Sequence, residues 1–258
     1  MNRFFTVNDN LDSHILIHIP HSSLHIPQDM TDDYLLSKEQ LELDCKILAD
    51  MYTDDLFGVP FEKFGGMRLD VNRAFIDVER FREDNNEPMS KIGMGVAYTK
   101  TSELKDLRIL KYKDKILDIY DAYHSALDNL VEQKVQKFGK CLIVDCHSFP
   151  SIPRAFMLDS NIDDIAICIG YEDFHKDINA VFILENGFKA KGYKVSHNMP
   201  YSGSIVSNKH FGKDNRVKSV MIELNRGIYM DDIHTFKQNE NYQTIKNIIE
   251  DTFNKLKI

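Results

Sequence analysis

The chain has 258 residues, of which 43% are hydrophobic and 28% are charged, so it can bury a large core without disulfides. A net charge of −8 argues against a nucleic-acid or anionic-membrane partner, although it does not exclude a local basic pocket. The four cysteines lack C-x-x-C spacing and indicate neither a thiolate zinc site nor a redox motif. Because the sequence shows no secretory segment, long apolar run or linker, we expect one α/β domain over residues 1–258, located in the cytoplasm.

The first predicted strand covers residues 15–19 and ends at Pro20. His21 follows directly, so it is either a metal ligand or a residue that anchors the loop after the strand. His14 and His18 fall on alternate strand positions, and we interpret them as surface or sheet-face residues.

A capping box formed by Ser37 and Gln40 predicts a helix that runs toward Phe57. Asp44 shares the apolar stripe of this helix and is expected to face inward. An inward carboxylate needs a metal ion or an arginine as its partner, unless it lies at the margin of the stripe and reaches water.

A second strand is predicted over residues 67–71, and Asn72 stands at its end. Arginines in an acidic chain suggest an anion pocket, because a guanidinium matches a carboxylate with two parallel hydrogen bonds. The alternative is a solvated loop held by salt bridges. The arginines in and after this strand are Arg68, Arg73, Arg80 and Arg82.

Residues 85–101 lack periodicity and are predicted to form an active-site loop or a surface excursion. Residues 102–139 have a helical pattern that is long for one globular helix, so we expect a break within it. His124 lies on the apolar stripe of this helix, which is typical of a core histidine or of one that supports a neighbouring site.

The stretch over residues 142–150 (LIVDCHSFP) is an apolar strand that ends abruptly in polar residues. Ligands of open α/β sheets bind at the carboxyl ends of strands, so His147 is a candidate zinc ligand there. A histidine that merely forms a hydrogen bond at a strand end is the alternative.

The same pattern of a strand followed by polar residues recurs at 219–224, where Glu223 lies within an apolar run. A glutamate in a buried strand serves either as a general base or as the partner of a neighbouring arginine. Between these strands, the sequence predicts a short apolar run at 165–169, a helix at 176–191 and a strand at 193–198. An amphipathic helix over 239–256 closes the chain.

Taken together, the motifs resemble those of the N-formylglutamate amidohydrolase family, and they follow the family's order over nearly the whole chain. The resemblance implies a three-layer α/β/α fold with a mixed central sheet, akin to zinc carboxypeptidases. It also implies a zinc-dependent amidohydrolase, which typically converts N-formyl-L-glutamate and water to formate and L-glutamate in histidine catabolism. The motifs are HIPHSSLHIP at 18–27, RLDVNR at 68–73, DVERF at 77–81, YHSAL at 123–127, VDCHS at 144–148, PYSGS at 200–204 and IELNRGIYM at 222–230.

The resemblance assigns His21 and His147 to zinc and Glu223 to the water that attacks the substrate. Related peptidases use H-x-x-E for two ligands, but Leu24 stands three residues after His21. The third ligand must therefore come from elsewhere. Asp44 is our choice, ahead of Asp50 and Glu79.

The remaining roles concern a small anionic N-acyl amino acid substrate. Either an arginine, with Arg68 as the candidate, or zinc itself is expected to stabilise the oxyanion of the reaction. Other zinc amidases or carboxypeptidases would use the same chemistry, and a non-catalytic binding relative is a third interpretation. The residues expected to bind substrate are Asn72, Arg73, Arg80, Arg154 and Tyr201.

Overall fold

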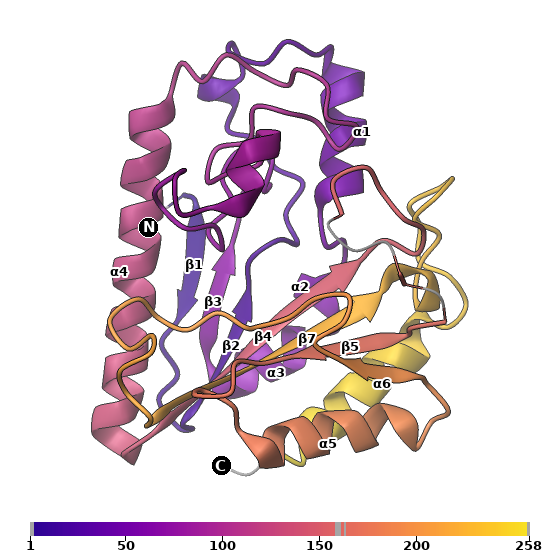
Figure 1. Ribbon diagram of the computed structural model, residues 1–258. Coiled ribbons are helices and arrows are strands. Elements are labelled where there is room, and N and C mark those ends of the chain that lie inside the picture. Colours follow the sequence, from indigo (N-terminus) through magenta and orange to yellow (C-terminus); the bar gives the residue numbers. More distant parts are fainter. Residues whose placement is uncertain (1–2, 158–160, 163, 257–258) are drawn as a thin grey trace.

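A computed structural model describes residues 3–157, 161–162 and 164–256 (Figure 1). Its centre is a seven-stranded sheet with the strand order β1-β3-β2-β4-β7-β5-β6. Four neighbouring strands, from β3 through β2 and β4 to β7, are parallel, whereas β1 and β5 run antiparallel to their neighbours β3 and β7. The strands are β1 Phe5–Asn8, β2 Ile15–Ile19, β3 Gly66–Leu69, β4 Cys141–Phe149, β5 Ile167–Gly170, β6 Val195–His197 and β7 Val217–Asn225.

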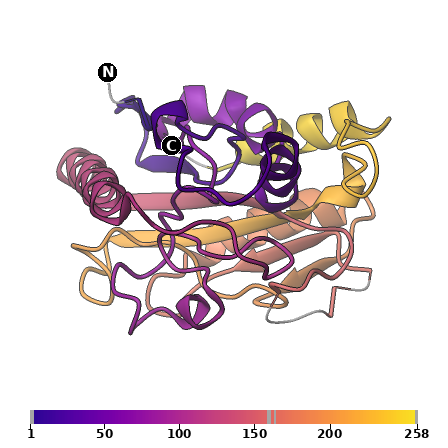
Figure 2. The same cartoon turned by 90° about the horizontal axis from the view of Figure 1, so that it is seen from above.

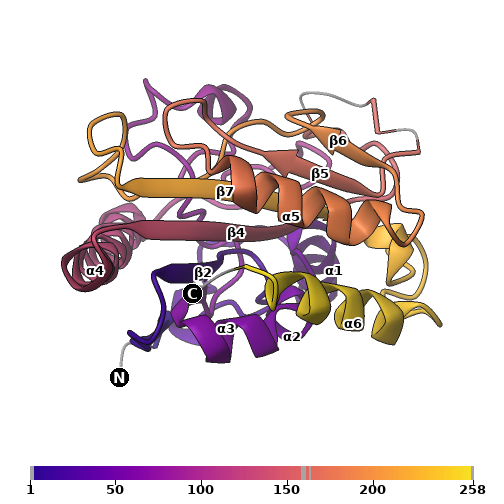
Figure 3. The same ribbon diagram turned by 90° about the horizontal axis from the view of Figure 1, so that it is seen from below.

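Helices lie on both faces of this sheet, which confirms the predicted three-layer α/β/α fold with a mixed sheet. Figure 2 shows the yellow helix α6 on one side of the sheet and the purple-to-pink loops on the other. Figure 3 shows α2, α3 and α6 on the same face, whereas α4 packs with β1, β2 and β3 in a separate core cluster. The helices are α1 Lys38–Leu48, α2 Thr53–Leu56, α3 Gly58–Phe64, α4 Lys113–Phe138, α5 Ile178–Lys189 and α6 Tyr242–Phe253, with short 3-10 turns η1 Gln28–Met30, η2 Pro88–Ile92 and η3 Arg226–Ile228.

Two predicted helices are shorter than their sequence patterns suggested. The first ends at Leu48, because the backbone N–H of Asp50 bonds to the carbonyl of His21 and Tyr52 adopts a left-handed conformation with φ 69°. The long one begins only at Lys113, since the preceding segment forms isolated bridges. The short edge strand β1 was not predicted. In the described part of the chain, no helix is both long and apolar enough to cross a membrane.

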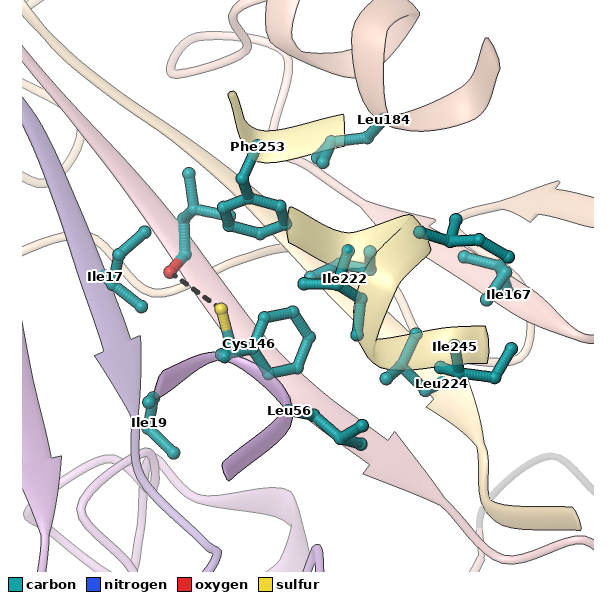
Figure 4. Close-up of a cluster of buried hydrophobic side chains, with 14 of the residues drawn as sticks. Ile17, Ile19, Leu56, Cys146, Ile167, Leu184, Ile222, Leu224, Ile245 and Phe253 are labelled. Atoms are coloured by element: carbon teal, nitrogen blue, oxygen red, sulfur yellow. Dashed lines mark hydrogen bonds between the residues drawn. The ribbon is translucent and has the colours of Figure 1, made fainter. Parts of the chain in front are cut away.

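Strand alternation separates the core from the face that carries function. Along β2, Ile15, Ile17 and Ile19 pack in the cluster beneath α2, α3 and α6, whereas Leu16 packs toward α4. Figure 4 shows the first cluster, in which Cys146 of β4 lies among aliphatic side chains. The alternate residues of β2, β4 and β7 therefore point to the α4 face. Loop segments that follow β3 and β6 run across this face, and Ile205 packs against the α4 cluster.

Candidate metal centre and active-site cavity

The register of the parallel strands brings the polar strand residues together on the α4 face. His147 of β4 lies opposite Glu223 of β7, and Asp145 of β4 lies opposite His18 of β2. Asp145 and His147 are two residues apart, so their side chains leave the strand on the same side. The strand periodicity that buries the aliphatic residues thus collects these four groups at one place.

Three buried side chains converge on one point near the carboxyl ends of β2 and β4. The Nδ1 atoms of His21 and His147 are 3.3 Å apart, and Asp50 Oδ2 lies 3.1 Å from His147 Nδ1 and 3.7 Å from His21 Nδ1. Ligand atoms placed 2.0–2.2 Å from a tetrahedral zinc ion are roughly 3.3–3.6 Å apart. His21, Asp50 and His147 thus form a group of potential metal ligands with the spacing that zinc requires.

The atoms that do not face this point are held by buried charges. His21 Nε2 lies 2.9 Å from Asp77 Oδ1, and His147 Nε2 lies 2.9 Å from Asp145 Oδ1. Asp50 Oδ1 accepts a hydrogen bond of 3.0 Å from the Arg226 guanidinium. Zinc-binding histidines usually present their second nitrogen to a carboxylate in this way, which fixes the ring and raises its basicity. The residues present therefore fit a zinc ion.

The charge balance of the centre favours ionised carboxylates. Burial alone would raise the pKa of Asp50, but the imidazoles of His147 and His21 and the nearby Arg226 hold it well below its usual range. Burial would lower the pKa of His147, yet the carboxylates of Asp145 and Glu79 raise it well above the ordinary value. The carboxylates that attract this proton would also attract a metal cation, which must displace the proton to bind the imidazole.

A cavity of about 500 Å³ opens beside these ligands and holds the anion-binding groups. Arg73 and Arg80 line it, and both guanidiniums lie against Asp77, at 2.8 and 3.3 Å. Arg73 Nε is buried without a hydrogen-bond partner in the described part of the chain, and Arg80 Nε, the atom that faces Asp77, makes an ion-pair contact without an aligned hydrogen bond. Tyr201 forms part of the same wall. Three of the five expected substrate-binding residues, Arg73, Arg80 and Tyr201, thus lie in the cavity.

Glu223 lines this cavity as well, although its side chain is only 7% exposed. Its Oε2 atom finds no hydrogen-bond partner among the described residues. Burial raises the pKa of Glu223 to about 8, against the opposing effect of the positive His147 nearby. The predicted alternative, a glutamate paired with a neighbouring arginine, is not what the structure shows, because no salt bridge to Glu223 occurs in the described part of the chain.

The structure places Asp44, our choice for the third zinc ligand, away from the two histidines. Its Oδ1 atom accepts hydrogen bonds from the backbone N–H and the hydroxyl of Ser102, at 2.9 and 2.5 Å. Asp44 does face inward, as the helix pattern predicted, but the helix packs there against a loop. Asp50, a weaker candidate, occupies the position near the histidines instead.

Three other expected site residues also lie outside the cavity. Arg68 pairs with Asp70 at 2.8 Å and borders a separate surface hollow, so it cannot stabilise an oxyanion beside Glu223. Asn72 is fully buried and donates hydrogen bonds to the carbonyls of Ser23 and Cys45, so its side chain links two separate segments of the chain. Arg154 donates to the carbonyl of Asp232 and is absent from the cavity wall.

Several residues of the site escaped the sequence analysis. Asp77 stands four residues after Arg73, a spacing that could have indicated the pair. Asp145 stands two residues before His147, and strand alternation predicts that both share a face. His18, which we interpreted as a surface or sheet-face residue, is fully buried on the α4 face. His124, by contrast, was interpreted as a core histidine or one that supports a neighbouring site, and it lies in the cavity wall with its Nε2 2.8 Å from the carbonyl of Val78.

Comparisons with known proteins support the family resemblance of the sequence motifs and the fold. The family model of N-formylglutamate amidohydrolase matches residues 13–230, which is most of the chain. A crystal structure of N-formylglutamate amidohydrolase from Ralstonia eutropha JMP134 is similar, with a TM-score of 0.82, 20% identity, and coverage of 97% of this chain and 96% of that chain. Gene product Atu2144 from Agrobacterium tumefaciens is also similar, with a TM-score of 0.66, 16% identity and coverage of 98% and 96%. Among curated proteins, none matches the chain.

Proposed function

Because the chain belongs to the N-formylglutamate amidohydrolase family, we propose that it hydrolyses the amide bond of an N-acyl amino acid with the help of zinc. The substrate we propose is N-formyl-L-glutamate, which would yield formate and L-glutamate. The observation that carries the proposal is the convergence of His21, Asp50 and His147 beside the unpartnered Glu223 in one cavity.

The donor set supports zinc as the cation. Two imidazole nitrogens with one carboxylate suit zinc better than calcium or magnesium, which prefer oxygen ligands. A set of three protein ligands also leaves one position open, as in catalytic sites. When bound, zinc supplies Lewis-acid chemistry that makes water a nucleophile near neutral pH and polarises a carbonyl.

Glu223 is suited to move the proton in this reaction. It takes the proton from the attacking water and returns it to the nitrogen of the leaving amine, so that formate and a free amino acid result. A pKa of about 8 lies close to neutral pH, where one carboxyl group can both accept and donate a proton. Glu223 Oε2 has no hydrogen-bond partner among the described residues, so no neighbouring group competes for the proton, which supports the same role.

Arg73 and Arg80 are positioned to hold a substrate carboxylate. Each guanidinium has N–H groups that Asp77 does not use, and both side chains are mostly buried. A charge-assisted hydrogen bond in such a place contributes about 1.5–3 kcal/mol. Asp77 therefore orients two arginines and is also hydrogen-bonded to His21, so one carboxylate contacts both the substrate-binding arginines and a zinc ligand.

The cavity also gives reason to consider a second substrate class. Its wall includes the apolar side chains of Phe156, Met157 and Phe211 beside the polar groups. Such a wall favours an N-acyl amino acid with a larger acyl group or side chain, on which the same residues would act. A protein that only binds its ligand has no need of the unpartnered Glu223, which supports an enzyme over a binding relative.

A substrate panel tests the proposal. Zinc-loaded protein is incubated with the formyl, acetyl and succinyl derivatives of glutamate, glutamine and methionine, and free amine is measured. We expect hydrolysis that disappears when a chelator removes the metal and returns when zinc is restored. Absence of hydrolysis across the panel would contradict the proposed function. The cytoplasmic location and the place in histidine catabolism stay predictions.

A further inference from the structure

A chain of buried polar groups extends from His147 away from the cavity to the helix α4. The Tyr123 hydroxyl lies 2.7 Å from His18 Nε2, and His18 Nδ1 lies 2.7 Å from Asp145 Oδ1. Asp145 Oδ1 in turn forms an ion-pair contact of 2.9 Å with His147 Nε2, without the alignment of a hydrogen bond. The side chains of Tyr123 and His18 are both fully buried, so water does not satisfy them.

The direction of these hydrogen bonds follows from the ends of the chain. Asp145 is held as a carboxylate and can only accept, so His18 Nδ1 carries the proton that it donates. With that proton on Nδ1, the other nitrogen, Nε2, is the atom that faces the Tyr123 hydroxyl and can accept its hydrogen bond. Hydrogen bonds that run in one direction through a dry interior polarise and strengthen one another.

The arrangement matters because His147 Nε2 has a second carboxylate in reach. Glu79 Oε2 lies 3.2 Å from this nitrogen, only slightly farther than Asp145 Oδ1. His18 Nδ1 lies close to Asp145 but 3.6 Å from Glu79 Oε1. The backbone N–H of Ile205 holds the other Asp145 oxygen at 3.2 Å. Without His18, Asp145 would lose its shortest hydrogen bond and the ring of His147 would be free to turn toward Glu79.

We propose that Tyr123 and His18 are positioning residues, which act through Asp145 to hold the His147 ring with Nδ1 toward Asp50 and His21. The role rests on the proposed function, because it serves the zinc ligand His147. Neither residue lines the cavity, and both act through the carboxylate of Asp145, which does. Three residues, Tyr123 on α4, His18 on β2 and Asp145 on β4, thereby define the orientation of a single ligand.

The test combines zinc affinity with a signal from the His147 ring itself. Zinc affinity is measured by competition with a chromogenic chelator in the wild type, Tyr123→Phe, His18→Leu and His18→Asn. Loss of a residue that supports a metal ligand from outside typically costs about 10–100-fold in metal affinity. We expect a loss of this size for His18→Leu and about three- to tenfold for Tyr123→Phe. His18→Asn keeps an N–H near the position of Nδ1 and should recover most of the affinity.

The second readout is the set of imidazole ¹⁵N chemical shifts of His147 in metal-free protein, which report where the ring proton resides. We expect these shifts to change in Tyr123→Phe and His18→Leu. The matched control is Tyr242→Phe, which likewise removes one tyrosine hydroxyl, here one that donates to Asp55 on the opposite face of the sheet. The control should leave both the shifts and the zinc affinity unchanged.

The two readouts separate the inference from the function on which it rests. If the wild type binds no zinc but its His147 signals depend on His18 and Tyr123, the proposed metal fails and the positioning role stands. If Tyr123→Phe and His18→Leu leave the ring signals and the zinc affinity as in the wild type, the positioning role is refuted. A fall in melting temperature alone, with His147 signals unchanged, would also assign these residues to packing and refute it.

Discussion

Replacing Glu223 with glutamine removes a proton acceptor while it conserves the shape of the side chain. If Glu223 takes the proton of the attacking water, the amide cannot replace it at neutral pH. A positioned general base contributes about 10²–10⁴-fold to a reaction rate. The expected loss in kcat corresponds to about 3–5 kcal/mol of transition-state stabilisation. Zinc content should stay the same, because Glu223 is not among the proposed ligands.

The same substitution has a second consequence for stability that the structure allows us to work out. The pKa of Glu223 is about 8 in the folded protein and 4.5 in a model peptide. Between these values the folded state binds more protons than the unfolded state, so the free energy of unfolding falls as pH rises. For metal-free protein the loss from this residue reaches at most about 5 kcal/mol above pH 8. Glu223→Gln lacks a titrating group and should escape this loss.

Three measurements check this prediction: kcat with zinc bound, zinc content, and urea unfolding of metal-free protein at pH 5 and pH 9. The matched control is Glu172→Gln, which changes another carboxylate of the cavity wall, one that is exposed to solvent. The control should keep most of the activity and the stability profile of the wild type. A loss in turnover below about tenfold for Glu223→Gln would show that another group is the base. Identical pH dependence of unfolding in both proteins would refute the burial argument.

Three other substitutions probe the neighbouring groups. Arg73→Ala should lower kcat/KM about ten- to a hundredfold, and the loss should be equal for formyl-glutamate and formyl-glutamine if the guanidinium binds the α-carboxylate. Arg73→Lys should restore only part of the lost kcat/KM. Unchanged kcat/KM of Arg73→Ala on both substrates would remove Arg73 from the site. Asp77→Asn removes a charge between two guanidiniums and should reduce the free energy of unfolding by about 3–5 kcal/mol in urea titrations, and an unchanged midpoint would contradict that role. Asp44→Asn should leave zinc affinity unchanged in chelator competition, because Ser102 occupies its carboxylate; weaker binding would restore Asp44 as a ligand.

The sequence was most informative where an apolar strand stopped at a polar residue. His21, His147 and Glu223 were identified in this way, and the structure brings all three to one cavity. The reason is physical: parallel strands align their carboxyl ends, so residues that terminate separate strands become neighbours. Strand alternation also predicts which face each residue takes, and Asp145 could have been assigned on that basis.

The third ligand could not be assigned correctly, because helix periodicity reports only that a residue faces inward. Asp44 does face inward, but it meets Ser102 rather than the histidines. Asp50 lies just past the end of α1, where no periodicity applies. Its place is determined by a backbone hydrogen bond to the carbonyl of His21, a contact between segments far apart in sequence.

The arginines of the site could also be assigned only in part from the sequence. The sequence predicted Arg68, Arg73 and Arg80 as parts of one anion pocket, yet only Arg73 and Arg80 reach the cavity. The difference depends on Asp77, which gathers those two guanidiniums, and on Asp70, which holds Arg68 elsewhere. These pairs are local in sequence, but which of them lies at the cavity depends on the tertiary fold, which residue spacing does not determine.

The metal content of purified protein tests the central claim most directly. We predict about one zinc per chain in the wild type, little in His147→Ala and Asp50→Asn, and the wild-type amount in Asp44→Asn, measured by atomic emission after dialysis. Melting curves of the metal-free forms serve as the control for folding. Full zinc content in folded His147→Ala and Asp50→Asn would contradict the assignment of these residues as the metal centre.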